Sequence, residues 1–216
     1  RSLRPAGVTF WSSAADAPRE RRPTDVGVAV GGVIIMALLS LAAPGPTDID
    51  GKVATAIAAF PGLPTWLWQT MYAASLLWVI VLVLTAVLTR HRRVLAVEQL
   101  GAVLLSLGVG GLLAVLEGAT WDQVWASFVA HDSTTVYPAI RFIVVVSVVA
   151  VTAPHLARPP RRLGTWVALI SGIGALALAI DTLLGLVAGL VLGVTVAAVV
   201  HLVPAGTHEL SPLGTN

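Results

Sequence analysis

The chain has 216 residues, of which 56% are hydrophobic and only 11% charged, and its formal net charge is +2. Soluble domains carry about 25% charged residues, so this composition leaves too little polar surface for a domain that faces water all round. No basic stripe with interleaved aromatic residues occurs, which excludes a nucleic-acid surface. Cysteine is absent, which excludes disulfides and thiolate metal sites. We expect an integral membrane protein without metal or cofactor.

Residues 1–25 are polar, basic and proline-containing, without the apolar segment of a signal peptide, and predict a flexible cytoplasmic tail. The rest, residues 26–203, is dominated by apolar stretches of about the 17–25 residues that a helix needs to cross a bilayer. These six stretches are Val26–Ala43, Met71–Leu88, Leu100–Leu116, Val136–Ala153, Leu163–Ile180 and Thr182–Val203. We predict an all-α, polytopic bundle of six transmembrane helices.

The junction Pro44–Thr70 predicts a short amphipathic helix, because Val53 and Ile57 repeat at helical spacing after two possible capping aspartates. The favoured interpretation is an interfacial helix on the outer leaflet, and the alternative is a lid over a site between the helices. A second amphipathic segment, Glu117–Thr135, carries aromatic residues at helical spacing and predicts another outer interfacial helix.

Charge alternates in sign between the stretches. Arginines crowd the first, third and fifth junctions, whereas the even junctions are acidic apart from Lys52. Of 13 Lys and Arg residues only Lys52 and Arg141 fall on the predicted outer side, which by the positive-inside rule puts both termini in the cytoplasm. Arginine outnumbers lysine twelve to one, a bias typical of GC-rich bacteria, so we expect a bacterial inner membrane. Residues 204–216 then form a cytoplasmic tail or a linker to a missing domain.

Glycine recurs every four residues in the last stretch, at Gly185, Gly189 and Gly193. This spacing puts all three on one helix face, the pattern that lets helices approach closely in lipid. Packing within the chain is the favoured interpretation, and a dimer interface is the alternative. Gly27 and Gly31 repeat the spacing in the first stretch.

Three charged residues stand at membrane depth near the predicted outer surface: Glu117, Arg141 and Asp181. Charges in such positions are candidates for function. The arginine can pair with either carboxylate, or hold a lipid phosphate through its planar fork of donors. The plain alternative is that Arg141 snorkels to the interface. We predict that the three form a charge cluster or a lipid-phosphate site.

The order of these features resembles the type-2 phosphatidic-acid phosphatase family over residues 26–203. Active members carry K-x6-R-P after the third span, P-S-G-H at the start of the fourth, and S-R-x5-H-x3-D across the last two. The resemblance implies covalent phosphoryl transfer, in which one histidine attacks phosphorus and a second protonates the leaving oxygen.

This chain keeps the frame of that family and lacks its catalytic residues. Residues 137–141 read YPAIR, so Pro138 matches and Arg141 replaces the general-acid histidine. Asp181 replaces the nucleophilic histidine, Gly185 replaces the final aspartate, and residues 174–175, Gly-Ala, replace the Ser-Arg pair. Glu117 follows the third stretch, where no K-x6-R-P occurs. We therefore expect no phosphatase activity and no catalytic residue.

Degenerate modules of this kind are similar to the N-terminal membrane part of actinobacterial multidomain proteins related to lysyl-phosphatidylglycerol synthases and flippases. The resemblance implies a non-catalytic module that supports the binding or transport of an envelope lipid, anionic or polyprenyl-phosphate, by a larger membrane protein. Two alternatives remain: a lipid phosphatase with a diverged site, and a purely structural anchor or oligomerisation domain. The only partners that we expect are the bilayer, its lipids and further domains of a longer chain.

Overall fold

A computed structural model describes residues 23–41, 47–59, 64–89, 92–129 and 135–203, and this part of the chain is helical without any strand. Most of the predicted N-terminal tail and all of residues 204–216 lie outside it. The elements are α1 (Pro23–Leu41), α2 (Asp48–Ala59), α3 (Thr65–Leu88), α4 (Arg93–Leu116), α5 (Trp121–Val129), α6 (Ile140–Thr152), the 3-10 turn η4 (Ala153–His155), α7 (Arg158–Ala177) and α8 (Leu183–Leu202).

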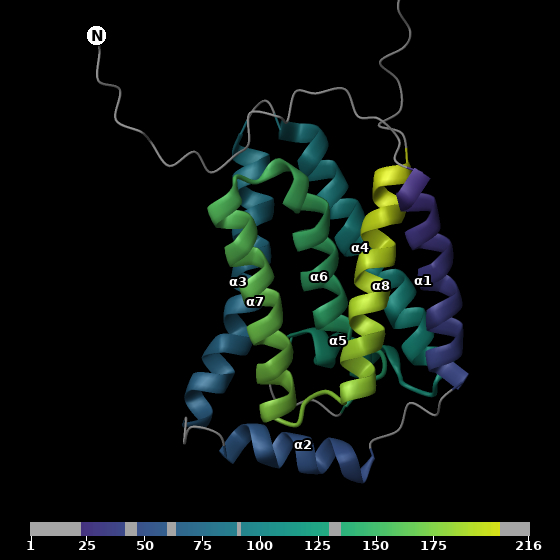
Figure 1. Ribbon diagram of the computed structural model, residues 1–216, viewed down its shortest axis with the longest axis vertical. Helices are drawn as coiled ribbons and strands as arrows, with labels where there is room; N and C mark the ends of the chain where they lie inside the picture. The colour runs from purple at the N-terminus through teal and green to yellow at the C-terminus, as the bar shows by residue number, and fades with distance from the viewer. Residues whose placement is uncertain (1–22, 42–46, 60–63, 90–91, 130–134, 204–216) are drawn as a thin grey trace, which may run out of the picture.

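The long helices α1, α3, α4, α6, α7 and α8 run side by side in alternating directions, and α2 lies across one end of the bundle (Figure 1). We call this end, which also holds α5 and residues 178–182, the acidic end. Its charged residues in the described part of the chain are Asp48, Asp50, Lys52, Glu117, Asp122 and Asp181. The opposite, basic end holds Arg92, Arg93, Arg158, Arg161 and Arg162, together with the start of α1 and the end of α8.

Four of the described helices are long and apolar enough to cross a membrane: α1 from Thr24, α3, α4 and α8. The other two predicted spans are less clear. Residues Ile140–His155 are apolar but form a shorter helix. The helix α7 opens with the charged segment RPPRR, which lowers its mean hydropathy. Several boundaries also differ from the prediction: α3 begins earlier, at Thr65, α4 at Arg93 and α7 at Arg158, whereas α6 begins later, at Ile140.

The surface of the bundle is apolar, and its mainly apolar interior also contains polar side chains. Large aliphatic and aromatic side chains are exposed along α1, α3, α4 and α7, whereas serines, threonines and Gln99 are buried. An apolar surface of this extent marks contact with lipid rather than water. Inside, Gln99 Nε2 donates to Thr152 Oγ1 at 2.8 Å, and Ser106 Oγ donates to Ser147 Oγ at 2.9 Å. These hydrogen bonds join α4 to α6, as expected where apolar burial supplies little drive for association.

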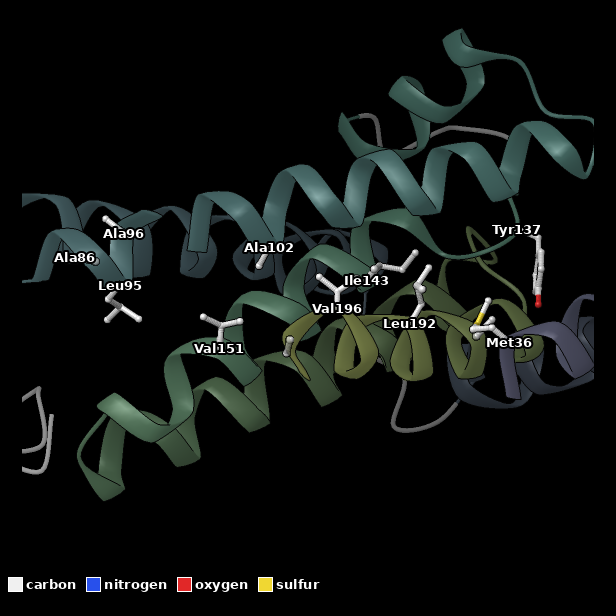
Figure 2. Packing of buried hydrophobic residues seen from close by; sticks show 12 residues of the cluster. Met36, Ala86, Leu95, Ala96, Ala102, Tyr137, Ile143, Val151, Leu192 and Val196 are labelled. Atoms are coloured by element: carbon white, nitrogen blue, oxygen red, sulfur yellow. The ribbon is translucent and has the colours of Figure 1, made fainter. Parts of the chain in front are cut away.

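The centre of the bundle is α6, with eleven of its thirteen residues buried. It packs against α4, α7 and α8, and more lightly against α3. One core cluster joins side chains of α1, α4, α6 and α8, among them Met36, Ile143, Leu192 and Val196 (Figure 2). Because protein surrounds α6 on most sides, its side chains meet protein rather than lipid.

The glycine face of α8 packs against α6. A Cβ on Gly189 would lie 3.2 Å from Ala139 O, and one on Gly193 would lie 2.8 Å from Val146 Cβ and 3.0 Å from Ile143 O. Gly185 faces the same helix, with its own Cβ position 3.8 Å from Ala139 N. Residue 185 contacts residue 139, and residue 193, further along α8, contacts residue 146, further along α6. The two helices α6 and α8 therefore run in parallel. The described structure thus uses all three glycines for packing within the chain.

The glycines of α1 differ from those of α8. A Cβ on Gly32 would clash with Thr195 Oγ1 of α8, so this glycine lets the two helices approach closely. Gly27 and Gly31, whose spacing repeats that of α8, have no atom within 4 Å of a Cβ position. The packing of α1 therefore follows the face of Gly32 and Met36, one turn apart, and not the face of the predicted pair.

The substitution Gly193→Ala is expected to destabilise the bundle by about 1–3 kcal/mol, because the new methyl group overlaps the backbone and a β-branched side chain of α6. Reversible unfolding in mixed micelles measures the change. The control Gly27→Ala adds a methyl group in open space and should leave stability unchanged or raise it by up to about 1 kcal/mol. Equal effects of the two substitutions would contradict close packing of α8 on α6.

Candidate functional site

The most unusual side chain in the bundle is Arg141, the second residue of α6. It is only 2% exposed. In a helix, the Cα–Cβ bond tilts toward the N-terminus, so the side chain leaves α6 in the direction of the acidic end. A guanidinium in an apolar interior is costly unless its charge and its N–H groups are matched. Its surroundings therefore decide what it does.

The helix α3 supplies the direct partner of Arg141. Nη2 donates to the main-chain oxygen of Tyr72 at 2.7 Å, and Cζ lies 3.9 Å from the centre of the Tyr72 ring. Ser75 Oγ donates to the same oxygen at 2.7 Å, so two side chains converge on one carbonyl. The ring face attracts the cation, and this attraction strengthens where water is absent. These contacts hold the guanidinium in place without neutralising its charge.

The guanidinium keeps unused donors. Both Nε and Nη1 of Arg141 are buried and make no hydrogen bond. Each buried donor left unmatched costs about 1–3 kcal/mol, and more when it is charged. Nη2, which donates to Tyr72, is the nitrogen beside Nε–H, so Nε and Nη1 point in different directions and each can donate to a separate anionic oxygen. The site thus offers two separate, buried donors to anionic oxygen atoms.

The carboxylate that acts on Arg141 is Asp181, in the connection between α7 and α8. The preceding Ile180 is buried against Tyr72 and Ala139, which anchors this connection on the site. Desolvation raises the pKa of Asp181 to about 7, although the positive charge of Arg141 acts to lower it. Because Nε and Nη1 have no hydrogen-bond partner, Asp181 acts on them through space. The two charges are neighbours without a hydrogen bond to either nitrogen.

The helix α2 covers this group at the acidic end. Leu183 N donates to Asp50 Oδ1 at 2.8 Å, which ties α2 to the start of α8. Val53 and Ile57 pack on the cluster that contains Tyr72. This helix lies across the ends of its neighbours, as an interfacial helix would (Figure 1), and it also covers the site. Both predicted roles are therefore compatible with its position.

Asp50 is held by several donors. Besides Leu183 N, the main-chain nitrogen and the hydroxyl of Thr47 donate to Oδ2 at 2.8 and 2.7 Å. Burial acts to raise the pKa of Asp50, but these hydrogen bonds outweigh it and lower the pKa below 3.8. At neutral pH the residue is therefore an anion that caps the first turn of α8, together with Thr182 Oγ1, which accepts from Gly185 N at 2.9 Å.

The helix α7 adds a buried hydroxyl group near the same cluster. Ser171 is 1% exposed, and its Oγ has no hydrogen-bond partner. It stands two turns after Gly164, where a Cβ would lie 3.3 Å from side chains of both α3 and α6, so it faces the seam between these helices. Gly174, three residues further along α7, lies against Tyr72 of α3. Ser171 thus faces the seam where Arg141 meets Tyr72.

Of the three predicted site residues, the structure brings together Arg141 and Asp181. Glu117 is exposed at the end of α4, where its main-chain nitrogen donates to Leu113 O at 3.1 Å, and its charge acts on Tyr137. Sequence reasoning missed Tyr72, Ser75, Ser171 and Asp50. The available signal was weak: Tyr72 is one of only two tyrosines, and the serines are isolated hydroxyls in apolar runs.

The described residues around Arg141 offer hydrogen-bond donors, a carboxylate, hydroxyls and an aromatic ring, but no imidazole. The described histidines, His155 and His201, lie at the basic end. Within the described ranges, no three His, Asp or Glu side chains gather as a metal site would require. No protein-family model matches the chain, and neither the curated proteins nor the solved structures contain a significant match.

The substitution Asp50→Ala is expected to lower the free energy of unfolding by about 1–2 kcal/mol at pH 7, because it removes a charged acceptor from Leu183 N and Thr47. Since folding lowers the pKa of Asp50, its contribution is present at neutral pH and is lost as the pH falls below 3.8. Unfolding titrations at pH 7 and pH 3.5 measure the difference. Asp48→Ala, on the exposed side of α2, is the matched control. A deficit as large in the control would contradict the capping role.

Proposed function

We propose that the chain is a non-catalytic integral membrane module that binds the anionic headgroup of an envelope lipid at Arg141. In this role it supports the binding or transport of that lipid by a larger membrane protein. The observation that carries the proposal is the pair of unmatched guanidinium nitrogens, Nε and Nη1, in a residue that is only 2% exposed. An unmatched cation in an apolar bundle is unfavourable by itself, and an anionic group that enters the site removes this penalty.

A lipid fits the site better than a soluble anion does. The outer surface of the described helices is apolar, as contact with acyl chains requires, and Arg141 lies one turn inside the bundle. A diacyl or polyprenyl phosphate carries both features that the site and its surroundings match: an oxyanion for the free guanidinium donors and a long apolar body for the helix faces. The phosphate of a lipid is also already held near this depth by the bilayer.

The non-catalytic part of the proposal rests on the chemistry of the described site. Phosphoryl transfer through the enzyme needs a nucleophile with an activating base. The groups that surround Arg141 are Tyr72, Ser75, Ser171 and Asp181, and none of the hydroxyls is paired with an imidazole. A carboxylate at position 181 repels an anionic ester. Release of phosphate from phosphatidic acid or a polyprenyl phosphate by the purified chain would contradict this part.

We further propose that all six long helices cross a bacterial inner membrane, with the basic end in the cytoplasm. The helix α7 has 20 residues, which gives about 30 Å, and the segment Ile140–His155 is shielded from lipid by its neighbours. Alternating directions collect all arginines of the described junctions at one end, which the positive-inside rule assigns to the cytoplasm. Residues 23 and 203 would then both lie on the cytoplasmic side.

Cysteine labelling tests this orientation without background, because the chain contains no cysteine. Asp122→Cys at the acidic end should react with an impermeant thiol reagent applied to intact cells, and Arg162→Cys at the basic end should react only after lysis. Both positions are exposed, so the reagent can reach them from the proper side. Labelling in the opposite order would overturn the orientation, and labelling of both from outside would overturn the six crossings.

The substitution Arg141→Met tests lipid binding, since it keeps an apolar stem of similar length and removes every donor. The bound lipid is identified by mass spectrometry after extraction in native nanodiscs. We expect an anionic lipid that is enriched over the bulk membrane in the wild type and at least about tenfold less enriched in the variant. Arg161→Met, exposed at the basic end, is the control and should retain the lipid.

Two outcomes would contradict lipid binding at this site. One is equal enrichment in Arg141→Met and the wild type, which would make the arginine a structural charge. The other is a wild type that carries no enriched anionic lipid, which would favour the anchor or oligomerisation function. If Arg141→Met does not fold, Arg141→Lys serves instead, because a lysine keeps the charge and loses the guanidinium donors Nε and Nη1. Undiminished enrichment of the lipid in Arg141→Lys would also contradict lipid binding by Nε and Nη1.

A further inference from the structure

The charges of Arg141 and Asp181 act on one another, but Nε and Nη1 of Arg141 make no hydrogen bond to the carboxylate. The main-chain nitrogen of Ala139 donates to Gly185 O at 3.3 Å, so the start of α6 is fixed to the first turn of α8, next to Asp181. The arginine side chain points toward this end of α6. Its Nη2 is used by Tyr72, and its other two nitrogens are not used by Asp181. The carboxylate therefore balances the charge of the site while two separate donors of Arg141 stay open.

The charge balance of the site depends on what binds the free donors Nε and Nη1 of Arg141. With Asp181 ionised and no ligand bound, Arg141 and Asp181 sum to zero. A singly charged lipid headgroup on Arg141 would leave the site with one excess negative charge, in surroundings where net charge is strongly disfavoured. If Asp181 takes up a proton when the headgroup binds, the sum returns to zero.

We propose that Asp181 is the resident counter-ion of Arg141, and that a singly charged lipid headgroup replaces it as the ion that balances Arg141, while Asp181 takes up one proton from water. The inference rests on the lipid-binding function proposed above and specifies how the site works. The proton comes from solvent and ends on the Asp181 carboxylate, and no covalent bond to the lipid forms or breaks. Binding of the headgroup and protonation of Asp181 then favour one another.

The other charged groups near Asp181 do not change this balance. From α3 the site receives the Tyr72 ring, and from α2 it receives Asp50, which stays ionised because three hydrogen bonds hold it in that form. Asp48 and Lys52 of α2 are exposed, and the last turn of α7 and the first turn of α8 contain no charged side chain. Since Asp50 stays ionised, the change of charge in the site falls on Asp181.

The position of Asp181 also makes the exchange accessible near neutral pH. Desolvation raises the pKa of its carboxyl group to about 7, so protonation requires little free energy there. Below that pH the carboxyl group is already neutral, and lipid binds without uptake of a proton. Above it, each pH unit makes the required protonation about tenfold less favourable. The affinity for an anionic lipid should therefore be constant at low pH and fall as the pH rises above about 7.

Isothermal titration calorimetry of the whole chain in detergent tests the proposal, with short-chain phosphatidylglycerol as the probe. Its phosphodiester carries one negative charge throughout the range from pH 5.5 to 8.5. Titrations in two buffers with different ionisation enthalpies give the number of protons taken up on binding. At pH 8.5 the wild type should take up close to one proton, and its Kd should be about ten- to thirtyfold higher than at pH 5.5.

Three variants test the roles of Asp181 and Arg141 separately. Asp181→Asn should bind with the same Kd at both pH values, take up no proton, and bind about ten- to thirtyfold more tightly than the wild type at pH 8.5. Asp48→Asn removes an exposed charge from the same end and should keep the pH dependence of the wild type. Arg141→Met should show no saturable binding at either pH.

The outcomes distinguish the two proposals. A wild type that does not bind phosphatidylglycerol more tightly than Arg141→Met at any pH contradicts the lipid-binding function, and the inference fails with it. A wild type that binds through Arg141 without proton uptake and without pH dependence leaves the function intact and overturns the role of Asp181. Proton uptake is measured on the wild type, so this result does not depend on the folding of Asp181→Asn.

Discussion

The arrangement at the acidic end depends on a single physical demand, the burial of a guanidinium group in a bundle that lipid surrounds. Arg141 is held by the carbonyl of Tyr72 and by its ring, and its charge is balanced by a carboxylate on the α7–α8 connection. The same connection is fixed by Asp50 from α2 and by the glycine face of α8. The elements that close this end of the bundle thus all contact the surroundings of one cation.

This demand explains why small and polar residues occupy positions where a larger aliphatic chain would bury more area. Glycine at positions 172 and 174 brings α7 close to α6 and α3, with Cβ positions 3.3 Å from Phe142 and 3.5 Å from Trp68 O. Close approach of the three helices lets one guanidinium reach the main chain of α3. Serines in the seam add hydroxyl groups without the volume that would separate the helices again.

Hydropathy predicted the all-helical fold and four of the long apolar helices, because a long lipid-facing helix must be apolar along most of its length. It was less decisive for α6 and α7. A helix enclosed by protein need not span the bilayer by its own apolar residues, and one that opens with arginines lowers its mean hydropathy. The boundaries of α3 and α4 also differed, because Trp66, Trp68 and Arg93 continue helices whose apolar cores begin later.

The candidate site was partly visible in the sequence. An arginine in an apolar run stands out, so Arg141 was found, and Asp181 followed as one of few carboxylates. The main-chain oxygen of Tyr72 leaves no trace in the sequence, since any residue at that place offers a carbonyl. Glu117 shows the opposite error, because a carboxylate at the end of a span looks the same whether the helix turns it toward the bundle or toward the surface.

The enclosed position of α6 has a consequence for how the chain is made. A translocon releases helices to the bilayer according to their own hydrophobicity, and an arginine within the segment opposes release. The helix α6 combines such an arginine with only 13 residues, and its polar partners Gln99, Ser106 and Tyr72 come from helices synthesised before it. In the proposed six-span topology its entry into the membrane is therefore a cooperative event, in which α3 and α4 assist the helix that later lies at the centre.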